Sequence, residues 1–169
     1  MSEVSREHQA AAPSALKCAV ITVSDTRTPK TDSGGAEVVA RLEAAGHFIV
    51  LRKIVPDERS LMRPLLDRLA ATGEVDAVLL TGGTGISSRD RTCETVSEML
   101  TKELPGYGEL FRMLSYADIG PAAMLSRAVG GLIGKVVVLT MPGSPAGVRL
   151  AMEKIIVPQL PHLVREARR

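Results

Sequence analysis

A glycine-rich turn follows directly on a short apolar segment near the middle of the chain. Residues 77–80 read Ala-Val-Leu-Leu, and residues 81–85 read Thr-Gly-Gly-Thr-Gly. A short apolar run that ends at glycines predicts a buried strand and a tight turn, and the residues from Thr92 onward have helical spacing. Glycines allow positive φ and expose backbone N–H groups, while a helix N-terminus adds positive partial charge. The segment therefore predicts a strand, a turn and a helix start that together bind phosphate.

Two known kinds of phosphate loop do not fit this segment. It lacks the G-x-x-x-x-G-K-[ST] spacing of the P-loop, and residues 83–88 lack the third glycine of the dinucleotide fingerprint. The simpler alternative is that the glycines only make a tight connection between strand and helix. Asp90 favours a ligand instead, because a carboxylate at this position suits a phosphate that is bound together with Mg²⁺.

The composition favours one α/β domain. The chain has 169 residues, of which 45% are hydrophobic but only 2% aromatic, so the core must consist mainly of aliphatic side chains. Aliphatic strands that alternate with helical segments indicate a mostly parallel sheet between two layers of helices. We therefore expect a single three-layer α/β/α domain over residues 16–169. Residues 1–15 are small and polar, and we expect them to form a disordered N-terminal tail.

Charge and cysteine content argue against several classes of protein. Lys and Arg total 21 against 19 Asp and Glu, a near balance that gives no support to a nucleic-acid partner. Cys18 and Cys93 form no CxxC motif and no cluster with His, so we expect neither a disulfide framework nor a zinc site. We see no apolar stretch of membrane-spanning length and no signal peptide, and we expect a cytoplasmic protein without membrane contact.

The remaining elements follow from apolar spacing and turn residues. Strands are expected at 18–23, 47–55 and 77–80 and, as an antiparallel hairpin, within 129–139; helices are expected at 34–45, around 61–69, at 92–104, 109–117 and 121–128, and twice more after 145. In a parallel sheet the ends of the strands at Ser24, Val55, Thr81 and Thr140 share one edge, and ligands bind at that edge.

Three polar residues at this edge have two interpretations each. Asp32 and Ser33 come just before a helix, as ordinary N-cap residues do, but their loop is also a candidate for a second anion site. Asp57 likewise suits either an N-cap for the helix that follows it or a place in the pocket. The residues by themselves leave both alternatives open.

Several motifs in order along the chain resemble one family. TGGTG with an acidic residue after it, Ser24-Asp25, DSGG at 32–35 and MPGSP at 141–145 are similar to the MogA/MoaB family of molybdenum cofactor biosynthesis proteins. The resemblance runs from Lys17 to Leu163, and the stretches GYGELFRMLSYADIG and LSRAVGG are more like MoaB than MogA. Cys93 occupies a place where the family usually has proline, which would alter the entry into the helix.

The resemblance implies a reaction and a set of site residues. MogA-type members adenylylate molybdopterin, whose terminal phosphate attacks the α-phosphate of Mg-ATP and releases pyrophosphate. On this basis Asp57 and Asp90 are the predicted catalytic residues, and Asp90 is the predicted ligand of Mg²⁺. The residues predicted to line the pocket for ATP and molybdopterin are Ser24, Asp25, Ser33, Gly34, Thr81, Gly82, Gly83, Thr84, Gly85, Ser126, Arg127, Pro142, Gly143, Ser144 and Pro145.

Two other functions stay open beside the adenylyltransferase. Some MoaB-type members lack the reaction, so a non-catalytic molybdopterin-binding or carrier protein of the same pathway is the main alternative. A nucleotide pyrophosphatase like the related competence-damage-type domains is the third. The family also implies a homotrimer or homohexamer and contact with other proteins of the pathway, and apolar positions on the helix from Gly106 are consistent with self-association.

Overall fold

One six-stranded sheet organises the protein. The computed structural model describes residues 15–169, so the predicted tail at 1–15 lies outside the described residues apart from Ala15. The strands are β1 (Lys17–Val23), β2 (Phe48–Val55), β3 (Ala77–Thr81), β4 (Lys102–Glu103), β5 (Gly130–Ile133) and β6 (Val136–Met141), in the order β2-β1-β3-β6-β5-β4. The first three pairings are parallel and the last two antiparallel. The mostly parallel sheet with a C-terminal antiparallel hairpin is confirmed.

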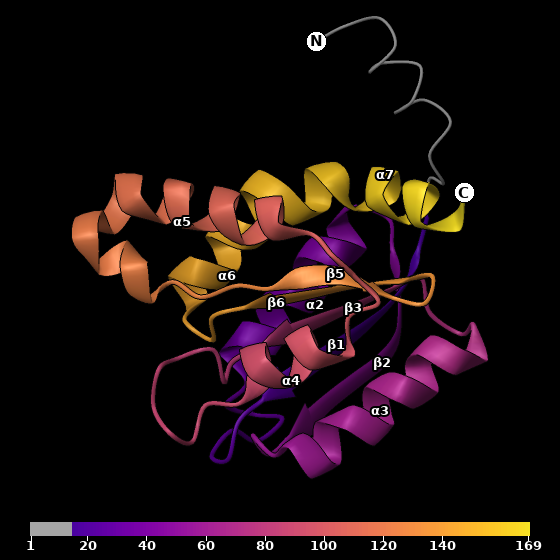
Figure 1. Cartoon of the computed structure of the whole chain (residues 1–169), viewed down its shortest axis with the longest axis horizontal. Coiled ribbons are helices and arrows are strands. Elements are labelled where there is room, and N and C mark those ends of the chain that lie inside the picture. Colours follow the sequence, from indigo (N-terminus) through magenta and orange to yellow (C-terminus); the bar gives the residue numbers. More distant parts are fainter. Residues whose placement is uncertain (1–14) are drawn as a thin grey trace, which may run out of the picture.

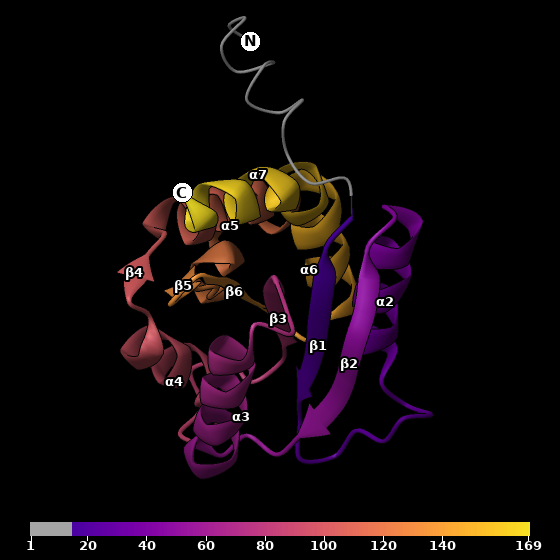
Figure 2. The same cartoon turned by 90° about the vertical axis from the view of Figure 1, so that its right-hand side faces the viewer.

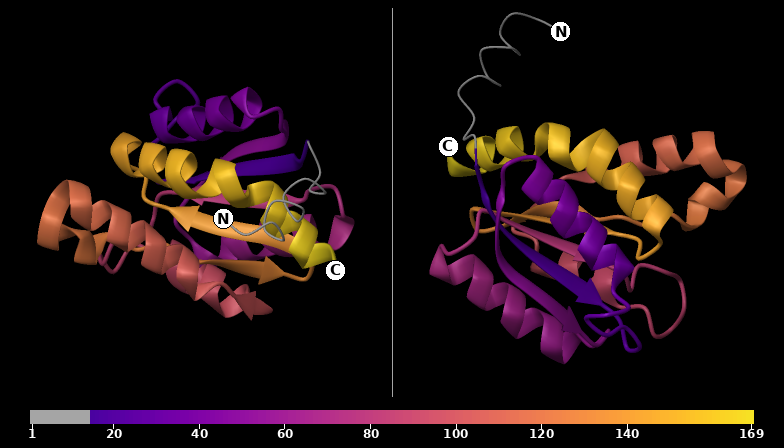
Figure 3. Two further views of the ribbon diagram at one scale, coloured as in Figure 1. Left: turned by 90° about the horizontal axis from the view of Figure 1, so that it is seen from above. Right: turned by 180° about the vertical axis from the view of Figure 1, so that it is seen from behind.

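Helices cover both faces of the sheet. One face carries α2 (Ser33–Ala44), α5 (Pro105–Ile119), α6 (Pro145–Ala151) and α7 (Val157–Arg168), and the other carries α3 (Arg59–Thr72) and α4 (Thr92–Met99). In Figure 1, α5 and α7 lie above the sheet while α3 and α4 lie below it, and in Figure 2 β1 and β2 lie between α2 and α3. Figure 3 shows α7 running across the sheet beside α5. This is the predicted three-layer α/β/α arrangement.

The core is aliphatic on both faces because the central strands are covered twice. Successive residues of a strand point to opposite faces, and accordingly Cys18 and Val20 pack with α2 and α7 while Ala19 and Ile21 pack with α3. Tyr107 and Phe111 of α5 are the buried aromatic residues, and the Tyr107 hydroxyl donates a hydrogen bond of 2.7 Å to the Thr140 carbonyl. Within residues 15–169 no helix combines the length and apolarity needed to cross a membrane.

The segment after β3 differs from the prediction. A helix over 92–104 was expected, but α4 ends at Met99 and residues 102–103 form the short strand β4. The Thr101 and Leu104 N–H groups donate to carbonyls of Leu132 and Gly130, so pairing with β5 replaces the last helical turn. Such tertiary pairing overrides local helix propensity.

Two further helix boundaries also differ. The helix expected at 109–117 begins earlier, at Pro105, because proline fits the first turn of a helix, where its missing N–H has no intrahelical partner to lose. The helix expected at 121–128 is the 3-10 helix η1 (Gly120–Leu125), which ends three residues sooner. A π-helical segment, η2 (Met152–Ile156), joins α6 to α7 without a break in the chain's helical course.

Candidate functional site

The predicted pocket lies where the loops after β1, β3 and β6 meet. These three strands run parallel as neighbours, so their carboxyl ends share one edge of the sheet. The loops surround a hollow of about 500 Å³. Its lining residues are Thr22, Val23, Ser24, Arg27, Asp32, Gly34, Thr81, Gly82, Gly83, Thr84, Gly85, Asp90, Leu125, Pro142, Gly143, Ser144 and Pro145. We call it the glycine pocket.

Glycine is required at two positions of the turn after β3. Gly82 has φ +99° and Gly83 has φ +64°, in the region that side chains disfavour. A methyl group on Gly82 would also collide with the Val23 carbonyl, and one on Gly83 would collide with the Asp57 carboxylate. The turn therefore brings the backbone closer to its neighbours than any other residue would allow.

A third close approach joins the turns after β1 and β6 to this one. A methyl group on Gly34 would lie 3.3 Å from the Gly143 carbonyl, and one on Gly143 would lie 3.3 Å from the Gly82 Cα. The Gly82 N–H donates to the Met141 carbonyl at 3.0 Å, and the Thr81 hydroxyl donates to the Pro142 carbonyl at 3.1 Å. Backbone packed this tightly makes a rigid floor for the glycine pocket.

Asp32 caps the helix that begins beside this floor. Its carboxylate accepts hydrogen bonds from the Gly35 N–H at 2.8 Å and from the Thr22 hydroxyl, and it pairs with Arg52 at 3.0 Å. This is the N-cap interpretation, and it applies to Asp32 although the residue also lines the glycine pocket. Ser33 is the first residue of α2, is exposed and does not line the pocket.

Asp90 is the predicted catalytic carboxylate that does line the glycine pocket. Its Oδ2 accepts a hydrogen bond from the Ser87 N–H at 3.0 Å and lies so close to Gly85 that a methyl group there would be 2.6 Å away. The carboxylate is thus held against the last glycine of the turn. A phosphate bound at this turn would lie beside it.

Asp57 lies next to the same turn but is buried, with 5% of its surface exposed. Its Oδ1 accepts a hydrogen bond of 3.1 Å from the Arg91 N–H at the start of α4, and its side chain packs against Gly83. Burial raises the pKa of Asp57, and the charges of Asp90 and Asp25 act in the same direction against the Arg91 hydrogen bond. Asp57 does not cap α3, so its interpretation as the N-cap of the helix that follows it is wrong. Asp57 instead accepts the hydrogen bond from the Arg91 N–H at the N-terminus of α4.

Asp25 does not line the glycine pocket, and its carboxylate binds Arg89 in the loop between β3 and α4. Arg89 donates two hydrogen bonds to its carboxylate, from Nε at 2.6 Å and from Nη2 at 2.9 Å, and a third to Glu58 at 3.4 Å. The Arg89 hydrogen bonds hold the pKa of Asp25 below its usual range. This contact fastens the loop that carries Asp90 to the loop after β1.

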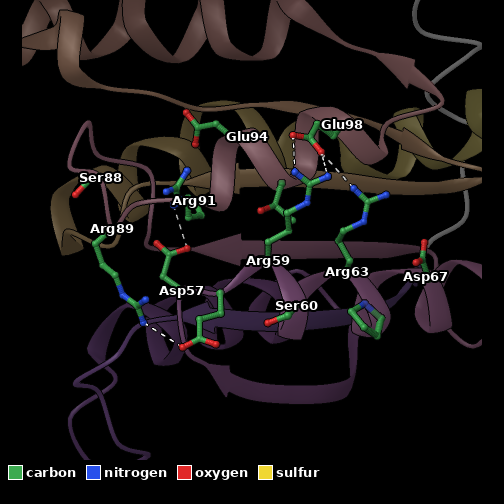
Figure 4. A pocket seen from close by; sticks show the side chains of 13 residues that line it. Asp57, Arg59, Ser60, Arg63, Asp67, Ser88, Arg89, Arg91, Glu94 and Glu98 are labelled. Atoms are coloured by element: carbon green, nitrogen blue, oxygen red, sulfur yellow. Dashed lines mark hydrogen bonds and ion pairs between the residues drawn. The ribbon is translucent and has the colours of Figure 1, made fainter.

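A larger hollow of about 980 Å³ lies between α3 and α4 (Figure 4). Its lining residues are Asp57, Glu58, Arg59, Ser60, Arg63, Pro64, Asp67, Ser88, Arg89, Arg91, Glu94, Thr95 and Glu98. Most of its charges already pair with one another: Arg59 and Arg63 bind Glu98, and Arg89 binds Glu58. Such a surface offers few unpaired groups to a ligand. Asp57 stands between this hollow and Gly83 of the glycine pocket.

The structure gathers most of the predicted pocket residues and leaves five outside the glycine pocket. Those that line it are Ser24, Gly34, Thr81, Gly82, Gly83, Thr84, Gly85, Asp90, Pro142, Gly143, Ser144 and Pro145; those that do not are Asp25, Ser33, Asp57, Ser126 and Arg127. Thr22, Val23, Arg27 and Leu125 line it and were not predicted to do so, and Asp32, which also lines it, was considered only as an N-cap or as part of a second anion site. Arg27 and Asp32 belong to the polar loop after the first strand, and this position is a sequence feature that could have predicted both as pocket residues. No feature of the sequence marks Leu125 as one.

A divalent cation at this site would depend on ligands from the substrate. Within residues 15–169 no three His, Cys, Asp or Glu side chains gather in the manner of a metal site. Asp90 is the acidic residue that lines the glycine pocket from the loop after β3, and Asp32, which lines it from the loop after β1, is engaged by Thr22, Gly35 and Arg52. Mg²⁺ commonly binds through one or two carboxylates with phosphate oxygens and water as its other ligands. The residues present fit that mode of binding.

The fold and the glycine pocket define a class of protein: an α/β domain with a pocket at the carboxyl edge of its parallel strands, the edge at which such folds bind ligands. The model of the family described as "Probable molybdopterin binding domain" matches residues 19–162. The chain belongs to this family, and the MoaB branch is the one it resembles.

Relatives by sequence and by structure agree with that assignment. The chain is 49% identical over 165 residues to molybdenum cofactor biosynthesis protein B of Bacillus subtilis (strain 168), with 97% of each chain covered. A crystal structure of molybdenum cofactor biosynthesis protein B matches with a TM-score of 0.89 and 48% identity, covering 93% of this chain and 98% of that one. The crystal structure of the tungsten cofactor synthesizing protein MoaB from Pyrococcus furiosus matches with a TM-score of 0.83 and 37% identity, covering 94% of this chain and 100% of that one.

Proposed function

We propose that the protein is a molybdopterin adenylyltransferase of molybdenum cofactor biosynthesis. The observation that carries the proposal is the position of Asp90, which lies against Gly85 on the wall of a pocket built from three tightly packed turns. In the reaction an oxygen of the terminal phosphate of molybdopterin forms a bond to the α-phosphorus of ATP. The bond from that phosphorus to the bridging oxygen breaks, and pyrophosphate leaves.

Positioning and charge neutralisation are what this reaction asks of a protein. Backbone N–H groups of the turn at 82–85 would hold phosphate oxygens, and the N-terminus of α2 would add positive partial charge. Asp90 would hold Mg²⁺, which when bound neutralises charge on the phosphates. The hydroxyl groups of Thr81, Ser24 and Ser144 would orient the two substrates from the surrounding loops.

Asp57 has an indirect part in this proposal. It keeps the N-terminus of α4 in place through the Arg91 N–H, and it lies near enough to Asp90 for the charge of Asp90 to contribute to the raised pKa of Asp57. The hydrogen bond to Arg91 bears on where the loop that carries Asp90 sits. Asp57 would therefore assist the reaction by holding the loop after β3.

The decisive experiment compares wild type with Asp90→Asn in the presence of molybdopterin and Mg-ATP. Asparagine keeps an oxygen that accepts the Ser87 N–H, so the loop is retained while the charge is removed. We expect adenylylated molybdopterin and pyrophosphate from wild type, and a rate lower by about 100-fold or more in the variant. Asp118→Asn, an exposed carboxylate on α5, is the control and should retain the full rate.

The alternative function is an outcome of the same experiment. If wild type binds molybdopterin but forms no adenylylated product, the protein is a binding or carrier protein of the pathway. Hydrolysis of a free dinucleotide without any pterin would instead favour the pyrophosphatase. An Asp90→Asn variant with the rate of wild type would contradict the role assigned to this carboxylate.

Self-association is a further part of the proposal. Leu110, Met113, Tyr116 and Ile119 recur every three residues along α5, and all four are exposed. Exposed apolar residues that form a continuous stripe mark a contact surface. A second copy of the chain would cover them in a homotrimer or homohexamer, and light scattering of wild type against Met113→Glu measures this directly.

A further inference from the structure

Arg127 connects two elements that are far apart in the sequence. It follows η1, and its Nε donates a hydrogen bond of 2.9 Å to the carbonyl of Thr84 in the turn after β3. Its two terminal nitrogens donate to the two carboxylate oxygens of Glu94 in the first turn of α4, at 2.8 and 3.0 Å. All three nitrogens of the guanidinium are therefore engaged within the protein. Arg127 does not line the glycine pocket.

The hydrogen bond to Thr84 sets the direction of the next N–H group. The peptide bond between Thr84 and Gly85 is trans, so its C=O and N–H point to opposite sides. Because the carbonyl is held towards Arg127, the Gly85 N–H points away from it. Gly85 lines the glycine pocket, and its N–H donates to no group within residues 15–169. An unpaired N–H on this wall is a donor suited to a phosphate oxygen.

Glu94 supplies the fixed end of the connection. It lies on α4, which is anchored in the core by Val96 and Met99. The hydrogen bond from Arg127 is the main cause that lowers the pKa of Glu94, so the carboxylate stays charged and the pair stays formed at neutral pH. A planar guanidinium reaches a carbonyl and a carboxylate at fixed angles at once, which the single ammonium of lysine does not.

We propose that Arg127 is a positioning residue for phosphate binding. It acts through Thr84: with Glu94 as its anchor, it orients the Thr84–Gly85 peptide so that the Gly85 N–H faces the phosphate of the substrate. This inference rests on the proposed function for its substrate. It differs from the role predicted for Arg127, direct contact with nucleotide or pterin, because the contacts of its three nitrogens are internal.

The test compares two substitutions in the connection with a matched control on the same helix. Arg127→Lys keeps the positive charge but removes the planar guanidinium that binds Thr84 and Glu94 at once. Glu94→Ala removes the carboxylate that holds Arg127 in place. Glu98→Ala is the control: Glu98 lies one turn further along α4 and pairs with Arg59 and Arg63 without touching the turn after β3 (Figure 4). The readouts are kcat and KM for adenylylation with molybdopterin and Mg-ATP, the melting temperature, and Mg-ATP affinity by calorimetry.

Positioning through Thr84 predicts a distinct pattern. Arg127→Lys should lower kcat by about 100-fold, the loss that follows from a small misplacement of a reacting group. Glu94→Ala should lower kcat in the same direction, and the double variant should be no worse than Arg127→Lys alone because the two residues act as one unit. Glu98→Ala should retain the kcat of wild type, with a melting temperature like that of the other two variants.

Each departure from this pattern has one meaning. If Arg127→Lys keeps the wild-type kcat, or if Glu94→Ala keeps it while Arg127→Lys does not, the positioning role is overturned and the adenylyltransferase stands. If wild type itself forms no product, the proposed function fails. The affinity for Mg-ATP then tests the positioning role of Arg127 independently. Binding at least about tenfold weaker in Arg127→Lys than in Glu98→Ala then supports the positioning role, and equal binding overturns it.

Discussion

Two segments with the same order of strand, glycine-containing turn and helix meet at the glycine pocket and are built differently. After β3 the chain reads TGGTG, and after β6 it reads MPGSP; both turns line the pocket. After β6 the helix α6 begins at Pro145, directly after the turn, whereas after β3 the helix α4 begins only at Thr92. The residues between Gly85 and Thr92 form a loop that carries Asp90.

The two helices also obtain their caps from different places. The Ser144 hydroxyl accepts a hydrogen bond from the Gly147 N–H, so α6 is capped by the residue just before it. No side chain at Arg91 caps α4, and the Arg91 N–H is bound by Asp57, which follows a different strand. The turn after β6 is thus specified by its own sequence, while the turn after β3 depends on distant residues. This dependence is what places a carboxylate on a loop at the pocket.

The largest expected effect is a difference in stability between alanine substitutions of a glycine in each of the two turns. Gly83→Ala forces a side chain into φ +64° and into collision with Asp57 and Thr92, and we expect it to lower the free energy of unfolding by about 3 kcal/mol. Gly143 has no left-handed φ, and a methyl group there lies 3.3 Å from the Gly82 Cα, so Gly143→Ala should cost about 1 kcal/mol. Urea unfolding measures both, and equal losses would contradict the difference between the turns.

The next effect isolates the cap that Asp57 supplies to α4. Asp57→Asn keeps an oxygen for the Arg91 N–H, while Asp57→Ala leaves that N–H without an acceptor. We expect the alanine variant to be less stable than the asparagine variant by about 1 kcal/mol, the usual worth of an N-cap. The comparison between the two variants, made by urea unfolding at pH 7, removes the shared loss of charge. Equal stability would show that Asp57 does not act as a cap.

A smaller effect tests the local cap of α6. Ser144→Ala removes the acceptor for the Gly147 N–H and should cost about 0.5–1 kcal/mol. Arg91→Ala at the equivalent position of α4 keeps the backbone N–H that Asp57 binds, so its effect should stay within about 0.5 kcal/mol. Thermal unfolding of the two variants side by side provides the measurement. A larger loss from Arg91→Ala would reverse the assignment of local and distant caps.

The smallest effect concerns pH. The pKa of Asp57 is raised in the folded protein, so the folded state favours the protonated form. This contribution to stability is fully present below the unfolded pKa of about 3.9 and is lost as pH rises through the folded pKa. Asp57→Asn has no such group, so its stability relative to wild type should increase as pH is raised from about 3.5 to 7. A difference that does not change between these pH values would contradict the raised pKa.

Local patterns were sufficient to predict much of the fold. Apolar runs between turn residues predicted β1, β2 and β3, and the glycines at 130, 131 and 134 predicted the antiparallel hairpin. The shared carboxyl edge followed from parallel strands and placed Thr81 and Ser144 at one pocket, while the family resemblance added Gly34, which lines the same pocket. Helix ends were predicted less well, because β4 and η1 form where tertiary pairing and a change of helix type compete with helical spacing.

The sequence by itself determined which turns need glycine and which residues end the strands, because positive φ, apolar period and capping preference are properties of neighbouring residues. Only the tertiary structure decided that Arg89 binds Asp25, that Asp57 serves α4 and that Arg127 holds Thr84. These contacts join residues 64, 34 and 43 positions apart. They depend on the strand order β2-β1-β3-β6, which brings loops from separate parts of the chain to one edge of the sheet.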